Sequence, residues 1–140
     1  MGAAAKAITW GGNHMRAKFM AYINGTIEAL DFYCKAFNAK SQNCFKNADS
    51  DNFYAHAEIV IDEQAILGIS ERLCYNLDFT SGNAMQFWLL FDNEQRVKAA
   101  YDVLKDNAEV RCPPSPGGWC EVMVDLTDKY GIRWLMSYEG

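Results

Sequence analysis

The sequence predicts an α+β fold in which two βαβββ modules form a curved mixed sheet around a cavity. Amphipathic helical patterns occur twice, at residues 26–37 and 93–106. Each is preceded by one strand-like segment and followed by three, as judged by hydrophobic periodicity. Each helical pattern also closes on an Asn-Ala pair, beginning at Asn38 and at Asn107. The same order of elements therefore occurs twice, which predicts one unit built in duplicate.

The length of the chain fits a single domain. Its 140 residues allow burial of roughly 68–70% of the unfolded surface. We expect one domain at residues 16–140, with modules at about 16–71 and 84–139. Residues 1–15 lack the apolar stretch of roughly 7–15 residues that a secretory signal needs. We expect them to be an N-terminal extension or leader outside the fold.

The first module begins with a strand and a helix. Residues 16–23 alternate apolar and other side chains, a pattern typical of a strand. Asn24 and Gly25 predict a turn, after which Thr26 is expected to cap the helix with its side chain. Spacings of three and four residues predict one apolar stripe on this helix, made of Ile27, Leu30, Cys34 and Phe37.

Three further strands complete the first module. They are predicted at residues 39–46, 53–61 and 65–70, and the last two are joined in hairpin fashion through residues 62–64. The polar residues 47–52 are expected to form a turn. One helix covers only one face of such a sheet. Two copies can therefore curve so that their uncovered faces enclose a shared cavity.

The second module repeats this order. Its helix is predicted from Asn93 to about Asp106, and the rigid segment 113–118, PPSPGG, predicts a turn. Strands are predicted at residues 84–92, around 109–111, at 119–126 and at 131–138. The apolar face of the helix is predicted to consist of Val97, Ala100, Tyr101 and Leu104. We expect this half to pack as the first half does.

Charge and cysteine content exclude several classes of function. The chain has 13 basic and 18 acidic residues, a net charge of −5, and its basic residues form no stripe that would follow a phosphate backbone. We therefore expect no nucleic-acid partner. No apolar run approaches the roughly 20 residues of a membrane helix, so no membrane partner is expected. Five cysteines without a CxxC motif or export signal indicate a reducing compartment. We expect a cytoplasmic location.

His56 and Glu58 are the first candidate site residues. They lie two apart in a predicted strand, so they project from the same face. Ala57, Ile59 and Ile61 take the opposite face, which suits packing under the helix. The pair is predicted to be a catalytic general base with its orienting carboxylate, or part of a metal site. The alternative is a polar pair satisfied by cross-strand hydrogen bonds, or a dimer contact.

Aromatic residues provide a second set of candidates. Gln86 and Trp88 share one face of a predicted strand, and Trp119 and Trp134 lie on neighbouring strands. Aromatic side chains with a polar tip suit the wall of a small-molecule pocket. We predict that these four residues, together with Tyr22 on the first strand, bind a ligand. Plain core packing is the alternative for each tryptophan.

Three segments resemble a known family. They are NGTIEALDFYCKAFNAK, HAEIVIDEQAILGISE and WCEVMVDLTDKYGIRWLMSYE, and they resemble the PhnB-like branch of the glyoxalase/bleomycin-resistance/dioxygenase superfamily, also called vicinal oxygen chelate proteins. The likeness covers about residues 16–139. It implies paired βαβββ modules, a homodimer and a small-molecule cavity. Members of this branch carry a methyltransferase label. A methyltransferase of the usual kind needs a glycine-rich strand-to-helix turn to bind its cofactor, and this sequence has no such turn.

The metal site that this resemblance implies does not transfer to the sequence. Metal-using members bind a divalent ion with two His and two Glu. The corresponding positions fall near Met20 or Tyr22, at about Gly68, near Gln86 and at about Leu135. These side chains are poor ligands for a divalent cation. No cofactor is therefore predicted, although a divalent metal stays an alternative.

Three functions follow from these observations. The first is a glyoxalase/bleomycin-resistance-like protein that binds a small molecule in an apolar cavity without chemistry. The second is a lyase, isomerase or dioxygenase, metal-dependent or built on an atypical centre around His56 and Glu58. The third is a non-catalytic interaction module with a vestigial cavity. The missing ligands favour the first, and whether modules pair within or between chains stays open.

Overall fold

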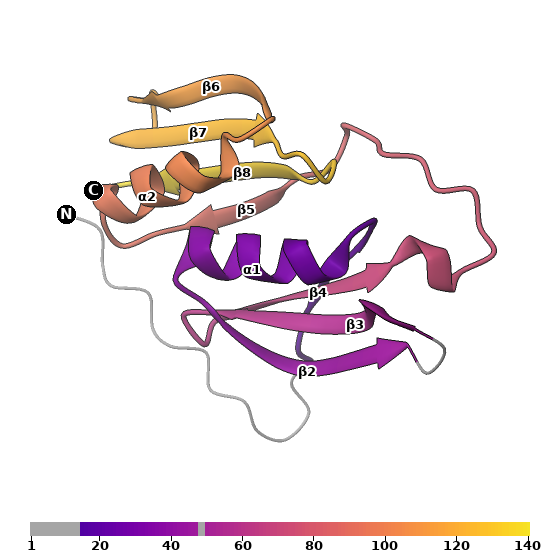
Figure 1. Ribbon diagram of the computed structural model, residues 1–140. Coiled ribbons are helices and arrows are strands. Elements are labelled where there is room, and N and C mark those ends of the chain that lie inside the picture. The colour runs from indigo at the N-terminus through magenta and orange to yellow at the C-terminus, as the bar shows by residue number, and fades with distance from the viewer. Residues whose placement is uncertain (1–14, 48–49) are drawn as a thin grey trace.

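The computed structural model describes residues 15–47 and 50–140, which form two four-stranded sheets and two helices (Figure 1). The first module consists of β1 (Phe19–Ile23), α1 (Thr26–Phe37), β2 (Lys40–Asn47), β3 (Ser50–Ile61) and β4 (Ala65–Glu71). A short 3-10 turn, η1 (Arg72–Cys74), follows. The second module consists of β5 (Phe87–Leu90), α2 (Glu94–Leu104), β6 (Glu109–Ser115), β7 (Val122–Thr127) and β8 (Arg133–Tyr138). The predicted duplication is confirmed.

The two sheets have the same topology. Their strand orders are β1-β4-β3-β2 and β5-β8-β7-β6, with the first strand of each module parallel to its last strand. The remaining neighbours are antiparallel. Among the described residues each module keeps its own sheet, rather than contributing to one continuous sheet. The inner edges approach at β1 and β5, where the rings of Phe19 and Phe87 stack 4.9 Å apart.

Helix α1 lies between the strands of the two modules (Figure 1) and packs beside α2. Helix α1 packs on its own sheet and also reaches the second, where the ring of Tyr33 lies 5.8 Å from that of Trp134. Arg96 of α2 donates a hydrogen bond of 3.0 Å to the carbonyl oxygen of Phe37, at the end of α1. One continuous core of buried side chains therefore spans both modules. No helix in the described part of the chain is long and apolar enough to cross a membrane.

This arrangement bears on a question that the sequence left open, namely whether the modules pair within one chain or between chains. Because α1 lies between the strands of the two modules, the uncovered faces point toward opposite outer sides of the chain. They therefore do not enclose a shared cavity within one chain. A cavity built from both faces requires a second copy of the protein.

The predicted start and apolar stripe of α1 are also corrected. The N-cap is Gly25, whose φ of 86° lies in the left-handed region that glycine tolerates. Thr26 does not cap the helix, because its Oγ1 donates to the carbonyl oxygen of Tyr54 and accepts from the Tyr54 amide. Of the predicted stripe only Phe37 is buried, and the side chains buried by α1 are Thr26, Ala29, Phe32, Tyr33, Ala36 and Phe37.

Two predicted turns are shorter than expected. β6 continues as far as Ser115 through Pro113 and Pro114, whereas the sequence predicted a turn from residue 113. β6 is an edge strand with register shifts against β7, and edge strands and bulges are where proline is tolerated. β3 similarly begins at Ser50, within the segment predicted as a turn. Residues 48–49 of that segment lie outside the described residues.

A buried carboxylate ties the two modules together. Asp128 follows β7, and its Oδ2 accepts hydrogen bonds from the Tyr33 hydroxyl at 2.6 Å and the Trp134 indole at 2.8 Å. Its Oδ1 accepts from the backbone amides of Tyr130 and Ile132. Burial raises the pKa of Asp128 more than these hydrogen bonds lower it. Helix α1 is thereby fixed to the turn between β7 and β8.

Candidate functional site

The uncovered face of the first sheet carries His56 and Glu58. The neighbouring Ala57 and Ile59 are fully buried toward α1, because successive side chains of a strand point to opposite faces. The predicted division of β3 into a helix-facing and an uncovered side is confirmed. The side chain of His56 is 27% exposed, whereas that of Glu58 is 8% exposed.

His56 is held at both ring nitrogens. Its Nε2 lies 3.1 Å from Oε2 of Glu58, and its Nδ1 lies 3.1 Å from Oγ of Ser70 on the adjacent strand β4. The register of the sheet places His56 opposite Ser70. The three side chains therefore form a continuous Ser-His-Glu chain across two strands.

Glu58 accepts hydrogen bonds from four side chains. Besides His56, its donors are Lys18 at 3.2 Å, Gln42 at 2.9 Å and Asn43 at 3.1 Å. Burial alone would raise the pKa of Glu58. The hydrogen bonds from its donors outweigh this effect and lower the pKa to about 2. The carboxylate is therefore charged throughout the neutral range.

This geometry limits the chemistry available to the pair. A carboxylate with a pKa of about 2 is a weak general base, and both nitrogens of His56 already face partners within the chain. Ser70 is 1% exposed, and its hydroxyl lies 3.7 Å from the sulfur of Met20, so the serine is covered. The arrangement favours a fixed polar surface. A catalytic role for His56 and Glu58 stays a prediction.

The uncovered face of the second sheet is aromatic. Trp88 is 53% exposed and Trp119 is 47% exposed, and their rings meet edge to face with centroids 5.4 Å apart. The indole of Trp88 donates to Oγ of Ser137 at 2.9 Å. Asp125 lies on the same face, paired with Arg133 at 3.0 Å. Two exposed indoles beside a charged pair suit a flat ligand with polar edges.

The structure separates Trp134 from the other predicted ligand-binding residues. Trp134 is 1% exposed and packs against Tyr33 and Phe37 of α1. It therefore lies in the core on the helix side of its sheet, as the alternative of core packing expected, and not beside Trp88. The cause is strand parity, since Trp134 pairs with Phe87 on the helix-facing side.

Tyr22 and Gln86 meet at the junction of the modules. Both line a hollow of about 350 Å³ between the inner edges of the sheets. Tyr22 stacks on Phe79 with centroids 5.4 Å apart, so the connecting segment folds against β1. Gln86 donates to Asp125 at 3.4 Å. Tyr22 is thus separated from the Trp88–Trp119 pair, whereas Gln86 is linked through Asp125 to the face that carries this pair.

Several partners of the predicted pair were missed from the sequence. Ser70 could have been found, because it lies two residues after Gly68 on a predicted strand and shares its face. Gln42 lies directly opposite Glu58, but this register was not predictable from the sequence, and Asn43 reaches Glu58 only through the register shift that follows Gln42. Asn43 adopts a positive φ of 49° there. A β-bulge of this kind leaves no clear periodic signal.

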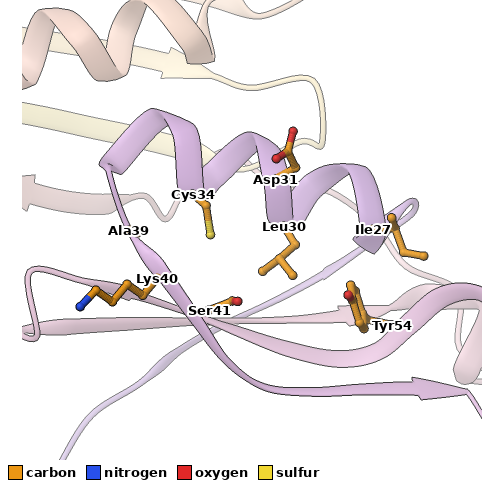
Figure 2. Close-up of a pocket in the computed structure, with 8 residues that line it drawn as sticks. All are labelled: Ile27, Leu30, Asp31, Cys34, Ala39, Lys40, Ser41 and Tyr54. Atoms are coloured by element: carbon orange, nitrogen blue, oxygen red, sulfur yellow. The ribbon is translucent and has the colours of Figure 1, made fainter.

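Another groove lies elsewhere, between α1 and the strands β2 and β3. It has a volume of about 600 Å³. Figure 2 shows Leu30 and Cys34 pointing into it from α1, the side of the helix that the sequence predicted to be buried. None of the predicted site residues lines this groove. It is therefore a separate surface feature.

The positions that correspond to metal ligands do not fit a divalent ion. Met20 lies opposite Gly68, and a Cβ placed on Gly68 would lie 3.1 Å from Met20 and 3.3 Å from His56. The space of a ligand side chain at this position is thus filled by a thioether and an imidazole. Within residues 15–47 and 50–140, no group of three or more His, Cys, Asp and Glu residues could hold a metal ion.

Solved structures share this architecture. Protein PA1353 from Pseudomonas aeruginosa matches with a TM-score of 0.76 at 19% identity, over 90% of this chain and 98% of that chain. The PhnB protein from Bacillus cereus matches with a TM-score of 0.72 at 18% identity, over 89% and 99%. A glyoxalase/bleomycin resistance protein/dioxygenase family enzyme from Burkholderia phytofirmans matches with 0.67 at 12% identity, over 88% and 97%. This chain has the glyoxalase/bleomycin-resistance fold.

The glyoxalase/bleomycin-resistance fold alone does not assign a function. No family model matches the sequence, and no curated protein matches it. The matched structures cover nearly the whole chain at identities below 20%. Function must therefore be argued from the two uncovered faces.

Proposed function

We propose that the protein is a small-molecule-binding protein of the glyoxalase/bleomycin-resistance type, related to PhnB-like proteins, that acts as a homodimer. In the dimer, the polar face of one chain's first sheet meets the aromatic face of the partner's second sheet. The ligand lies between them. It is a small molecule with a flat aromatic body and a polar group.

The observation that carries this proposal is the outward position of both faces. Large apolar side chains are exposed on them, including Trp88, Leu90 at 57% and Met20 at 45%. Exposed apolar surface of this kind marks a binding or association site. A two-fold dimer is the commonest closed assembly, and it places each face against its complement twice. The names of the matched structures include glyoxalase and bleomycin resistance proteins, which agrees with small-molecule binding.

The proposed function does not include catalysis. The residues at the positions of the metal ligands do not fit a divalent ion, and the side chains of His56 and Glu58 already have hydrogen-bond partners within the chain.

The proposal also includes a cytoplasmic location. This location is supported by the five cysteines, which are all free although two of them, Cys44 and Cys74, are exposed.

The proposal is tested by molar mass in solution and by tryptophan emission. We expect light scattering to give a dimer, and we expect Leu90→Lys to shift the mass toward the monomer. Ile27→Lys is the matched control, because Ile27 is 41% exposed on α1, away from both faces. Titration with 2-naphthol should change the emission of the native protein, and the change should shrink in Trp88→Phe. A monomer with unresponsive emission would overturn the proposal, and a dimer that ignores aromatic probes would favour the interaction module.

A further inference from the structure

The hollow between the modules continues into a second one. The first, of about 350 Å³, and the second, of about 290 Å³, share four lining residues: Arg72, Ser81, Tyr130 and Gly131. Together we name them the junction hollow. It is formed within one chain, between the β1 edge, the connecting segment after β4 and the turn between β7 and β8. It therefore does not require the dimer of the proposed function.

The charge of the junction hollow is opposite to that of the protein. The chain carries a net charge of −5. Among the described residues that line the hollow, three are cations, Arg72, Lys129 and Arg133, and none is acidic. A concave surface lined by one sign of charge concentrates ligands of the opposite sign. This part of the surface is therefore suited to an anion.

Two of these cations have carboxylate partners outside the hollow. Lys129 pairs with Glu28 at 2.7 Å, and Arg133 pairs with Asp125 at 3.0 Å. Their charges are largely compensated.

Arg72 differs from both, because its partners are neutral. Its Nε donates to the carbonyl oxygen of Tyr22 at 2.8 Å, and its Nη2 donates to Oγ of Ser81 at 3.2 Å. Its guanidinium lies 5.4 Å from the centre of the Phe79 ring. No carboxylate in the described part of the chain lies within ion-pair distance of it. Because a guanidinium has about five N–H donors, further donors stay available in a group that is already oriented.

Neighbouring groups add donors and apolar surface. The hydroxyl of Tyr130 is buried, and burial together with the neighbouring carboxylate of Glu28 raises its pKa, so it keeps its proton. Met85, Phe87 and Ile132 also line the first hollow. A pocket of this volume with a few polar groups and an apolar wall is typical of small-molecule sites.

We propose that the junction hollow binds a small organic carboxylate with an apolar body. The carboxylate pairs with the guanidinium of Arg72, since this planar fork matches its two oxygens. The body of the ligand lies along the apolar wall formed with Met85 and Ile132. Met20 and Arg133, at the inner edges of the two faces, also line this site, but neither Trp88 nor His56 does, and it is expected in the monomer as well as in the dimer.

Benzoate and its neutral isostere benzamide provide the test. Calorimetric titration of the full chain at low salt should show benzoate binding at least about tenfold more tightly than benzamide, and higher salt should weaken it. Arg72→Gln should weaken benzoate binding by about tenfold or more. Arg111→Gln is the matched control, because it removes the same charge on β6, where Arg111 pairs with Glu109; it should change the affinity by less than about twofold.

A second pair of variants avoids the loss of structural contacts by Arg72. Gly82 lines the hollow, and a Cβ there meets nothing within 4 Å. Gly82→Asp should therefore keep the fold and weaken benzoate binding by about tenfold. Gly118→Asp adds the same charge on an equally open glycine outside the hollow and should leave binding unchanged.

Three results would overturn the proposal: no benzoate binding, equal binding of benzamide, or insensitivity to both Arg72→Gln and Gly82→Asp. Leu90→Lys, which is expected to disrupt the dimer, should leave benzoate binding intact. The failure of the junction site and the failure of the proposed dimer are thus distinguished, since one is measured with benzoate and the other by mass and emission.

Discussion

The uncovered faces of the two modules have the same construction and different chemistry. In the first sheet the register aligns Met20, Gly68 and Glu58 across three strands. In the second it aligns Trp88, Leu135 and Asp125 in the same way. One row further along each strand, Ser70 lies opposite His56 and Ser137 lies opposite Met123. A carboxylate and a serine are thus retained, while the residues around them differ.

The consequence of this difference is a polar face and an aromatic face on one scaffold. Ser70 is engaged by His56, whereas Ser137 accepts from the indole of Trp88. Glu58 is enclosed by four donors and is 6% exposed as a residue. Duplication supplies the geometry twice, and side-chain choice then makes the copies complementary. Complementary faces on opposite sides of a chain favour association with a second copy.

The largest expected effect concerns the contact that holds the faces apart. Asp128→Ala should lower the free energy of unfolding by about 3 kcal/mol, because it leaves the buried donors of Tyr33 and Trp134 unpaired. Chemical denaturation monitored by circular dichroism measures this loss.

Asp62→Ala is the control for that prediction, because it removes a carboxylate from the turn of the other module. Asp62 pairs with Arg96, but its side chain is 46% exposed, so the loss should stay below about 1 kcal/mol. Equal losses in the two variants would contradict the view that Asp128 is the main polar link between modules.

The second prediction concerns the polar face and pH. The pKa of Glu58 is lowered to about 2 in the folded protein, and an unfolded glutamate titrates near about 4.3. Its contribution to stability is therefore complete above about pH 5 and is lost as the pH falls toward 2. Denaturation midpoints of the native protein and of Glu58→Gln should converge over this range. A constant difference between the two would show that the carboxylate charge contributes nothing to the first face.

The smallest expected effect compares the two serines. Ser70→Ala removes a partner from the half-buried ring of His56 and should cost about 1 kcal/mol. Ser137→Ala removes the acceptor of Trp88, which is 53% exposed and can donate to water instead, so the cost should be a few tenths of a kcal/mol. Thermal unfolding of each variant beside the native protein measures both losses of stability. The opposite order would mean that the aromatic face is the more rigid of the two.

The sequence predicted the fold because two periodicities recur in the same order. Alternation correctly divided β3 and β5 into inner and outer sides, so the outward position of His56 and Trp88 was predictable. The hydrophobic pattern did not predict which side of α1 is buried, because both sides of that helix carry apolar residues. Only tertiary contacts determine that Tyr33 is buried and Leu30 is not.

Features that depend on contacts between distant segments also could not be predicted from the sequence. A tryptophan in a strand is compatible with either the core or the wall of a pocket. The contacts of Trp134 with Tyr33 and Phe37 of α1 place it in the core. Which way the modules fold against one another depends on helix packing between halves. A pattern confined to each half does not contain that information, so the sequence left open whether the modules enclose a cavity within one chain or between chains.

Mixing two variants tests whether the binding site lies between two chains. Met20→Lys and Trp88→Lys change equivalent positions on the two faces, and each should abolish the 2-naphthol response as a homodimer. In a mixed dimer one site combines both changed faces and the other combines both native faces. Co-refolding the variants should restore binding to about a quarter of the native level, since about half of the dimers are mixed. No recovery on mixing would contradict a binding site between two chains.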